Sequence, residues 1–195
     1  MEQDDDRLSE QNCEKDIAME KVFMMYIIGM SGSGKTTIAN ALLEKLRARG
    51  KQRIQVIDGD IIRKQFGDIF GNTYEERMKC NRAVRVVADY LIDNQVSVIL
   101  AQVAAYREMR RKVREQFAEH YIEVYVKCSP EECARRDVKG YYRKYQLGEI
   151  HNLNGMDDVY EVPEEYDILV DTERETVEEC VQKIADYLEE KGYVL

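Results

Sequence analysis

Residues 29–37 read GMSGSGKTT, and this stretch decides the fold of the chain. It fits the pattern G-x-x-x-x-G-K-[ST] of a phosphate-binding loop, in which glycines let backbone N–H groups turn inward around phosphate oxygens. An apolar run at 22–28 precedes it and a helical pattern at 38–49 follows it, which is the strand-loop-helix setting of the motif. The stretch therefore predicts a nucleotide-binding site beside a parallel sheet.

The polar residues of this loop have distinct predicted tasks. Lys35 is expected to reach the β and γ phosphates and to act in catalysis, and Thr36 is expected to present its hydroxyl to Mg²⁺. Thr37 can donate to a phosphate from the next helical position. The predicted nucleotide contacts in the loop are Gly29, Ser31, Gly32, Ser33, Gly34, Lys35, Thr36 and Thr37.

The composition bounds the domain organisation. The chain has 195 residues, 44% of them hydrophobic, which suits one buried core. Residues 1–20 hold eight acids and two bases, so most of the net charge of −9 belongs to them. Their low hydrophobicity and high charge predict a disordered acidic tail, followed by a single domain at 21–195.

Several classes of function are disfavoured by the same composition. Nucleic-acid binding needs a basic face, which an acidic chain does not offer, so no nucleic-acid partner is expected. The five cysteines form no C-x-x-C pair and only two histidines are present, so we expect no zinc site and a reducing, cytoplasmic location. The apolar run at 22–30 is too short to span a bilayer, so no membrane partner is expected.

Strand and helix patterns alternate along the chain after the loop. Strands are predicted at 22–28, 54–57, 96–101, 121–126 and 168–170. Helices are predicted at 38–49, 74–93, 107–117, 130–136 and 177–188. This alternation predicts an α/β fold of three layers, with a parallel sheet flanked by helices.

Periodic spacing predicts which faces of two helices are buried. On the helix at 74–93, the residues predicted to face the core are Cys80, Val84, Val87 and Leu91. A second stripe on the same helix, which can meet anions, consists of Arg77, Asn81 and Arg85. On the last helix the predicted buried row is Val177, Val181, Ile184 and Leu188.

Carboxylates and arginines occur where the predicted strands end, and ligands bind at that edge of such sheets. Asp58 and Asp60 can face the γ-phosphate and its metal, and Asp60 can accept or orient the proton of an attacking hydroxyl. A simple Asp-Gly turn in which Asp60 caps a helix is the structural alternative, and both can hold. The arginines near strand ends, whose guanidinium forks suit phosphate and sulfate oxygens, are Arg63, Arg77 and Arg107. A basic cluster that can close over ATP consists of Arg135, Arg136, Lys139, Arg143 and Lys144.

Taken in order, these segments resemble the adenylylsulfate kinase family over residues 25–188. The matching segments are GMSGSGKTT at 29, DGDIIR at 58, YREMRR at 106, IEVYVKCSPEECARRD at 122, KGYYRK at 139 and GMDDVYEVP at 155. Members of that family move the γ-phosphate of ATP to the ribose 3′-hydroxyl of adenylylsulfate. Because several segments match in one order, the resemblance is more specific than the loop alone.

The resemblance implies a P-loop kinase fold with a mobile lid at about 136–155, a requirement for ATP and Mg²⁺, and a homodimer. It implies Lys35 and Asp60 as catalytic residues, Thr36 as the metal contact, and Arg136 with Lys139 at the ATP and lid site. On the acceptor side it implies Asp60 as the carboxylate and Arg63 with Arg77 as substrate contacts. The full set of predicted substrate contacts is Asp58, Asp60, Arg63, Arg77, Tyr106, Arg107, Lys144 and Leu153.

Departures from the family pattern cluster in the acceptor half. Ile61 replaces an asparagine, and Asn72 and Leu153 replace the two phenylalanines that in the family sandwich the adenine of adenylylsulfate. Stacking on aromatic side chains contributes about 1–3 kcal/mol per base. Our first interpretation is therefore a kinase of this family whose acceptor is another small nucleotide-linked anion, for example a cytidine diphosphate-linked acid such as cytidine diphosphoramidate. The alternative is a genuine adenylylsulfate kinase of sulfate assimilation.

Two interpretations from other classes also stay open. A GTPase-like switch module would prefer GTP, and the chain has no N-K-x-D guanine motif. A catalytically silent ATP-binding protein would bind ATP without releasing ADP, although Lys35, Thr36 and Asp60 are all present.

Overall fold

The computed structural model describes residues 21–194, apart from the side chain of Asp68. The predicted acidic tail at 1–20 lies outside the described residues. The strands are β1 (Met24–Ile28), β2 (Ile54–Asp58), β3 (Ser97–Gln102), β4 (Tyr121–Lys127) and β5 (Ile168–Asp171). The helices are α1 (Lys35–Ala48), α2 (Gly59–Gln65), α3 (Tyr74–Asp93), α4 (Arg107–Phe117), α5 (Pro130–Arg136), α6 (Tyr141–Gln146) and α7 (Val177–Glu190), with short 3₁₀ turns at Gly67–Ile69 and Ala118–His120.

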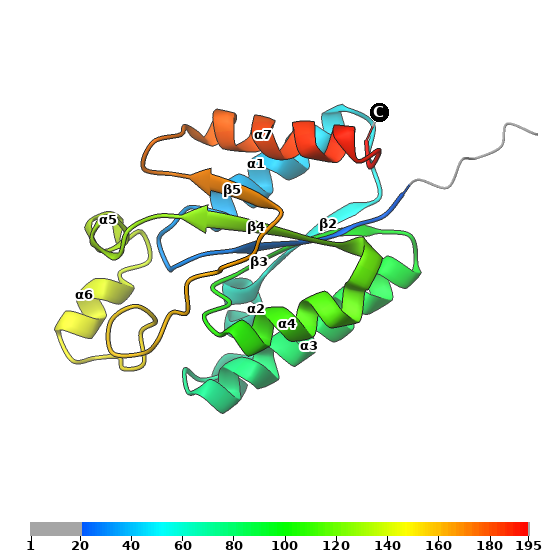
Figure 1. Cartoon of the computed structure of the whole chain (residues 1–195). Coiled ribbons are helices and arrows are strands. Elements are labelled where there is room, and N and C mark those ends of the chain that lie inside the picture. Colours follow the sequence, from blue (N-terminus) through cyan, green and yellow to red (C-terminus); the bar gives the residue numbers. More distant parts are fainter. Residues whose placement is uncertain (1–20, 195) are drawn as a thin grey trace, which may run out of the picture.

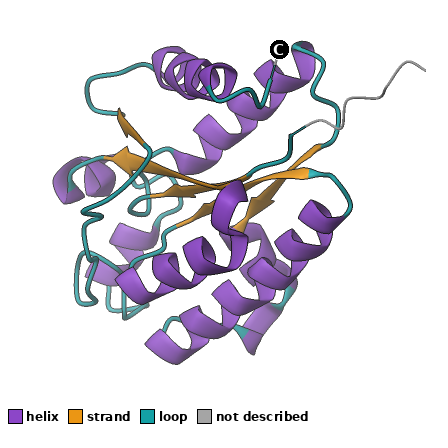
Figure 2. Ribbon diagram, turned by 45° about the vertical axis from the view of Figure 1, so that its right-hand side comes forward, coloured by secondary structure: helices purple, strands orange, loops and turns teal. Residues whose placement is uncertain are grey.

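The five strands form one parallel sheet in the order β2-β3-β1-β4-β5. Helices α1 and α7 cover one face, and α2, α3 and α4 lie on the other (Figure 1). The ribbon turned by 45° shows the sheet in profile between the two helical layers (Figure 2). The predicted three-layer α/β fold is therefore confirmed.

Strand β1 shows how the sequence divides between the two layers. Met25 and Ile27 join the apolar cluster under α1 and α7, whereas Met24, Tyr26 and Ile28 join the cluster under α3 and α4. All five residues of β1 are buried, as expected for a central parallel strand covered on both faces. The alternation of side chains along the strand therefore divides the core into two halves.

Two predicted core positions are wrong. Val87 on α3 is 46% exposed and Val177 at the start of α7 is 42% exposed. The buried residues of α3 are Cys80, Asn81, Val84, Ala88 and Ile92. Four of them follow an i, i+4 spacing from Cys80, and the face that this row forms does not include Val87. Val177 is the first residue of α7, ahead of the turns that face the sheet, and the three later residues of its predicted row are buried.

The register of the sheet brings the ends of three strands together. Ile28, which leads into the phosphate-binding loop, pairs with Gln102, and Asp58 pairs with Ala101. The carboxyl ends of β1, β2 and β3 therefore lie side by side, and the residues after them share one edge of the sheet. Among residues 21–194, no helix has both the length and the apolar character needed to cross a bilayer.

Candidate active site

The phosphate-binding loop joins β1 to α1, as its sequence predicts. Gly34, the N-cap of α1, has φ 99°, a left-handed conformation that glycine adopts without strain. Ser33 N–H donates to Met30 O at 3.1 Å, which closes the turn. The predicted loop contacts therefore lie on one turn at the N-terminus of a helix, where backbone N–H groups are available to phosphate oxygens.

Lys35 lies buried beneath this loop and is 7% exposed. Its Nζ donates to Met30 O at 2.6 Å, a neutral partner. Burial lowers the pKa of Lys35 to about 8, although the nearby carboxylate of Asp60 acts in the opposite direction. A buried ammonium is stabilised by an anion, so the loop and Lys35 fit the phosphates of ATP.

Thr36 and Asp58 meet at the side of the loop. Thr36 Oγ1 donates to Asp58 Oδ2 at 2.6 Å, and Asp58 Oδ1 accepts from Asp60 N–H at 2.8 Å and Ile61 N–H at 3.3 Å. Asp58 therefore caps α2, rather than Asp60 as the structural alternative proposed. Mg²⁺ keeps several waters and takes few protein ligands, so a hydroxyl and a carboxylate this close fit the metal expected beside ATP.

Asp60 lies in the first turn of α2 and its side chain is 37% exposed. Its Oδ2 forms an ion pair with Nζ of Lys139, a residue that follows α5 in the chain. Burial acts to lower the pKa of Lys139, but the hydrogen bond and charge of Asp60 outweigh it, so the pKa is raised. The structure thus joins the expected acceptor-side carboxylate to the expected lid.

One cavity connects the loop to the acceptor side. Its wall contains the loop residues Ser31, Lys35 and Thr36 and the expected substrate contacts Asp58, Asp60, Arg63, Arg77 and Leu153. Further lining residues that the sequence did not single out are Gln102, Met109, Tyr141, Ile150, His151 and Asn152. The predicted donor and acceptor halves therefore open into the same space.

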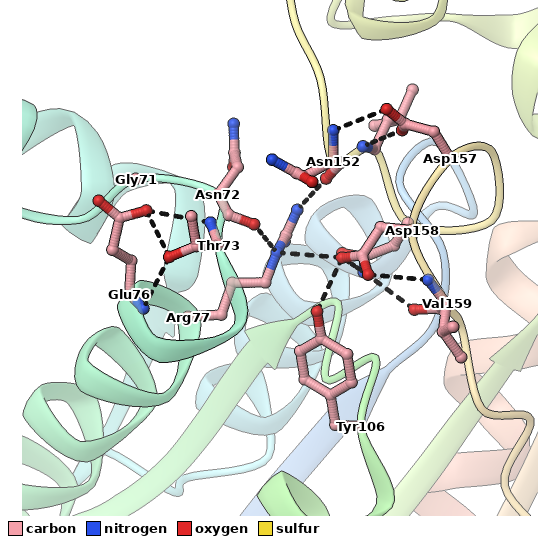
Figure 3. Close-up of polar contacts among 12 residues, drawn as sticks. Gly71, Asn72, Thr73, Glu76, Arg77, Tyr106, Asn152, Asp157, Asp158 and Val159 are labelled. Atoms are coloured by element: carbon pink, nitrogen blue, oxygen red, sulfur yellow. Dashed lines mark hydrogen bonds and ion pairs between the residues drawn. The ribbon is translucent and has the colours of Figure 1, made fainter.

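Arg63 and Arg77 reach this cavity but also make protein contacts. Arg63 donates to Phe70 O at 3.1 Å and to Gly71 O at 2.6 Å. Arg77 Nε donates to Asn72 O at 2.8 Å, and one of its terminal nitrogens donates to Asn152 O at 2.6 Å (Figure 3). Arg77 therefore ties the segment before α3 to the loop at 152–159.

The start of α3 is fixed by a capping box. Thr73 accepts from Glu76 N–H, and Glu76 Oε2 accepts from Thr73 N–H at 3.0 Å. A Cβ at Gly71 would meet the Glu76 carboxylate, so a larger residue there would have to displace that side chain from the capping box. These contacts place Asn72 and Arg77 at the mouth of the cavity.

Asp158 organises the opposite loop. It lies 3.7 Å from Arg77 Nε and accepts from Tyr106 OH at 2.7 Å (Figure 3). It also accepts from Asn154 Nδ2 at 2.8 Å. Burial, with the hydrogen bond to Asp158, raises the pKa of Tyr106 to about 12. The structure thus gives Tyr106 a partner in the loop, whereas the resemblance implied a substrate contact.

Other expected contacts lie outside the cavity wall. Arg107 is exposed and pairs with Glu164 at 2.7 Å, and Lys144 is exposed on α6. Arg136 donates to Glu132 and to Thr172, whose hydroxyl donates to Ser33 O in the phosphate-binding loop.

The predicted anion-facing stripe on α3 is wrong for two of its three members. Asn81 is 0% exposed and bonds Tyr26 and Gln102 in the core. Arg85 donates to Gln116 on α4 at 2.6 Å. The i, i+4 spacing predicts that the three residues share one face of α3. Beyond the first turns of the helix, the sheet covers that face at Asn81 and α4 contacts it at Arg85.

A family model described as adenylylsulphate kinase matches residues 21–171. The chain belongs to the adenylylsulphate kinase family. It is 40% identical to an adenylyl-sulfate kinase of Halothermothrix orenii over 90% of this chain and 94% of that protein. It is 41% identical to one of Rippkaea orientalis over 87% of this chain and 93% of that protein.

Solved adenylylsulphate kinases share the architecture. The APS kinase of Mycobacterium tuberculosis in complex with AMPPNP and APS has a TM-score of 0.80 and 30% identity, with 87% of this chain and 98% of that chain covered. A hexameric APS kinase from Thiobacillus denitrificans has a TM-score of 0.68 and 28% identity, with 91% of this chain and 30% of that chain covered.

Membership of the adenylylsulphate kinase family settles the reaction class. The chain is an ATP-dependent phosphotransferase that uses Mg²⁺ and acts on a hydroxyl of a small nucleotide-linked anion. The named relatives favour adenylylsulfate as that anion, so they support the alternative interpretation of the sequence better than a redirected acceptor.

Proposed function

We propose that this chain is an adenylylsulfate kinase, which transfers the γ-phosphate of ATP to the ribose 3′-hydroxyl of adenylylsulfate. The observation that carries the proposal is the shared cavity, in which Lys35 and Thr36 lie on the donor side and Asp60, Arg63 and Arg77 on the acceptor side. The identity of about 40% to adenylyl-sulfate kinases over nine-tenths of the chain supports the same acceptor.

Each residue of the cavity has a role that follows from its position on the donor or the acceptor side. Lys35 and the loop N–H groups hold and neutralise the phosphates, and Thr36 with Asp58 supplies oxygen ligands for Mg²⁺, which balances the charge of the transferring group. Asp60 orients the attacking hydroxyl and accepts its proton once Lys139 releases it. Arg63 and Arg77 offer guanidinium groups to the anionic part of the acceptor.

A second acceptor is favoured by one observation. Asn72 and Leu153 both line the cavity, at the positions where the family carries its adenine-stacking rings. Leu153 is 8% exposed and packs with Met30 and Tyr142, so it offers a flat aliphatic surface rather than a ring. A smaller base than adenine, as in a cytidine diphosphate-linked acid, is the acceptor that this difference would suit.

The test is phosphoryl transfer with product identification. Purified protein with Mg²⁺, ATP and adenylylsulfate should release ADP and yield an acceptor heavier by one phosphoryl group, placed on the 3′ oxygen by fragmentation. A Lys35→Met variant serves as the control for contaminating kinases. ADP release that stays flat with every acceptor while ATP binds would support the silent-protein interpretation instead, and preference for GTP would support the switch.

We also propose a homodimer, with the outer face of α3 as the contact. Val86, Val87 and Tyr90 are 48%, 46% and 70% exposed there. Light scattering should give twice the chain mass, and Val87→Glu should reduce it to the chain mass while the secondary structure is kept. A monomeric wild-type protein contradicts this assembly.

For the location we propose a reducing cytoplasm. The support is that Cys80, Cys128, Cys133 and Cys180 are all buried free thiols in the described part of the chain. Fractionation of the source cell with an antibody to the chain should place it in the cytosol, and recovery from an oxidising compartment contradicts the proposal.

A further inference from the structure

Gln102 occupies a special place at the floor of the cavity. It is the last residue of β3, pairs in register with Ile28 at the start of the phosphate-binding loop, and lines the cavity. It is 8% exposed, and the position of a Cβ on Gly59 lies 3.1 Å from its Cγ. The side chain is therefore held between the sheet edge and α2, and its amide faces the space that the acceptor enters.

The carboxamide oxygen of Gln102 is already satisfied from the core side. Tyr26 OH donates to Oε1 at 2.7 Å, and Asn81 Nδ2 donates to the same oxygen at 3.0 Å. Asn81 Nδ2 also lies 3.1 Å from Tyr26 OH, and both residues are 0% exposed. In the structure Oε1 of Gln102 is turned toward these two core side chains, so Nε2, with two N–H donors, is the end toward the cavity.

No hydrogen-bond acceptor within residues 21–194 pairs with Gln102 Nε2. Nε2 is not enclosed by protein atoms, so water in the cavity or a bound ligand can accept a hydrogen bond from it. Two core side chains, Tyr26 and Asn81, hold the amide oxygen of Gln102. This arrangement is consistent with a partner for Nε2 that the ligand supplies.

The surroundings indicate the chemistry of that partner. The wall beside Gln102 is formed by Ala101, Val103, Ala104, Ala105 and Met109, whereas the cationic groups of the cavity belong to Lys35, Arg63 and Arg77. A phosphate or sulfate is better served by the cations. A neutral donor beside this apolar stretch suits a neutral acceptor atom, such as a ring nitrogen or a carbonyl of a nucleobase.

We propose that Gln102 is a specificity-determining residue, whose Nε2 donates a hydrogen bond to an acceptor atom on the buried edge of the substrate's nucleobase, with Asn81 as its positioning residue. This rests on the proposed function, since adenylylsulfate presents ring nitrogens on each edge of its adenine. A base held by a hydrogen bond within an apolar slot needs less stacking, which accounts for a site that contains Asn72 and Leu153.

The test pairs protein variants with base analogues. Adenylylsulfate and its 1-deaza, 3-deaza and 7-deaza adenine analogues are compared by kcat/KM with the wild type, Gln102→Met and Tyr26→Phe. We expect the wild type to disfavour one deaza analogue by about tenfold or more. Gln102→Met should lose a similar factor on adenylylsulfate and show no further loss on that analogue.

Tyr26→Phe is the matched control, because it removes a core hydrogen bond to Gln102 but leaves Nε2 and Asn81 in place. It should unfold at a lower temperature than the wild type and still discriminate against the same analogue. A purely structural role for these core hydrogen bonds predicts that both variants lose activity equally on every substrate. Discrimination that survives in Gln102→Met, or a wild type indifferent to all three analogues, overturns the proposal.

The outcome is separable from that of the proposed function. If the wild type does not turn over adenylylsulfate, the proposed function fails by that result alone. The binding of adenosine and cytidine 5′-monophosphates and their deaza analogues, measured by calorimetry with the same variants, then decides whether Gln102 contacts the base.

Discussion

Thr36 and Asp58 lie 22 positions apart in the chain, and their side chains meet in a hydrogen bond of 2.6 Å from Oγ1 to Oδ2. The bond joins the first residues of α1 to the end of β2. Both oxygens therefore lie together beside the phosphate-binding loop, where they could serve Mg²⁺ with little reorganisation.

This pair gives a test with two variants of Asp58. Asp58→Asn keeps a good helix cap but loses the charge, so it should need a higher Mg²⁺ concentration for half-maximal activity while unfolding close to the wild-type temperature. Asp58→Ala loses the cap as well and should be destabilised by about 1 kcal/mol. An unchanged Mg²⁺ requirement in Asp58→Asn removes this carboxylate from the metal site.

The pKa of Lys35 predicts how ATP binding depends on pH. In the free protein this pKa is about 8, so the ammonium loses its proton as the pH rises above that value, and ATP phosphates bind the charged form. We expect ATP affinity to fall above pH 8, by up to about tenfold per pH unit. Lys35→Met should bind ATP more weakly and without this pH dependence, as measured by titration calorimetry.

The same shift affects stability with a definite sign. The unfolded chain holds this proton up to the ordinary pKa of 10.5, whereas the folded chain releases it near 8. Unfolding therefore takes up a proton between these values, and the contribution of Lys35 to stability rises as the pH rises from 8 to 10.5. Between pH 8 and 10.5 the denaturation midpoint of the wild type should rise relative to that of Lys35→Met. A difference between the two midpoints that does not change with pH would contradict the assigned pKa.

Asp60 and Lys139 form the contact between the acceptor side and the expected lid. Asp60→Asn should lower kcat by about 10²- to 10⁴-fold, because the base that accepts the hydroxyl proton is removed. Its circular dichroism spectrum should match that of the wild type, since the side chain is 37% exposed. Near-normal turnover in Asp60→Asn would exclude Asp60 as the base.

Arg77 should be important to the shape of the site as well as to its charge. Its side chain is 11% exposed and donates to two backbone carbonyls. Arg77→Met leaves those carbonyls and Asp158 without their cation, so we expect a loss of about 2 kcal/mol in the free energy of unfolding and faster amide exchange at 152–154.

Arg107→Met is the matched control for this prediction. Arg107 was also expected to contact substrate, but its side chain is 62% exposed in a surface ion pair with Glu164. Surface pairs of this kind contribute little, so neither stability nor KM should change measurably. A large increase in KM for Arg107→Met would place it at the acceptor after a closure that this structure does not show.

The fold could be predicted because its signals are local. The helix α3 was predicted at its observed bounds, 74–93, since its apolar period is long and uninterrupted. The strands were predicted within two residues of their observed ends by continuous apolar runs, which suit parallel strands buried on both faces. The phosphate-binding loop then set where the nucleotide lies relative to the sheet.

The acceptor side could be predicted only in part, because it depends on contacts between distant segments. Nothing in the local pattern of α3 shows that Asn81 is buried, since its partners Tyr26 and Gln102 come from two strands. Gln102 follows the predicted strand at 96–101 and carries no local signal, and the role of Asp158 depends on Tyr106 and Arg77, 52 residues and more away. Such networks become visible only when the sheet register is known.

The most direct test of the central claim is the ratio of kcat/KM for adenylylsulfate to kcat/KM for cytidine, uridine and guanosine diphosphate-linked acids, with Mg²⁺ and ATP fixed. We predict that adenylylsulfate is the preferred acceptor and is converted to its 3′-phosphate. Turnover confined to a cytidine-linked acid would contradict that claim. It would also indicate that Asn72 and Leu153 adapt the site to a different substrate.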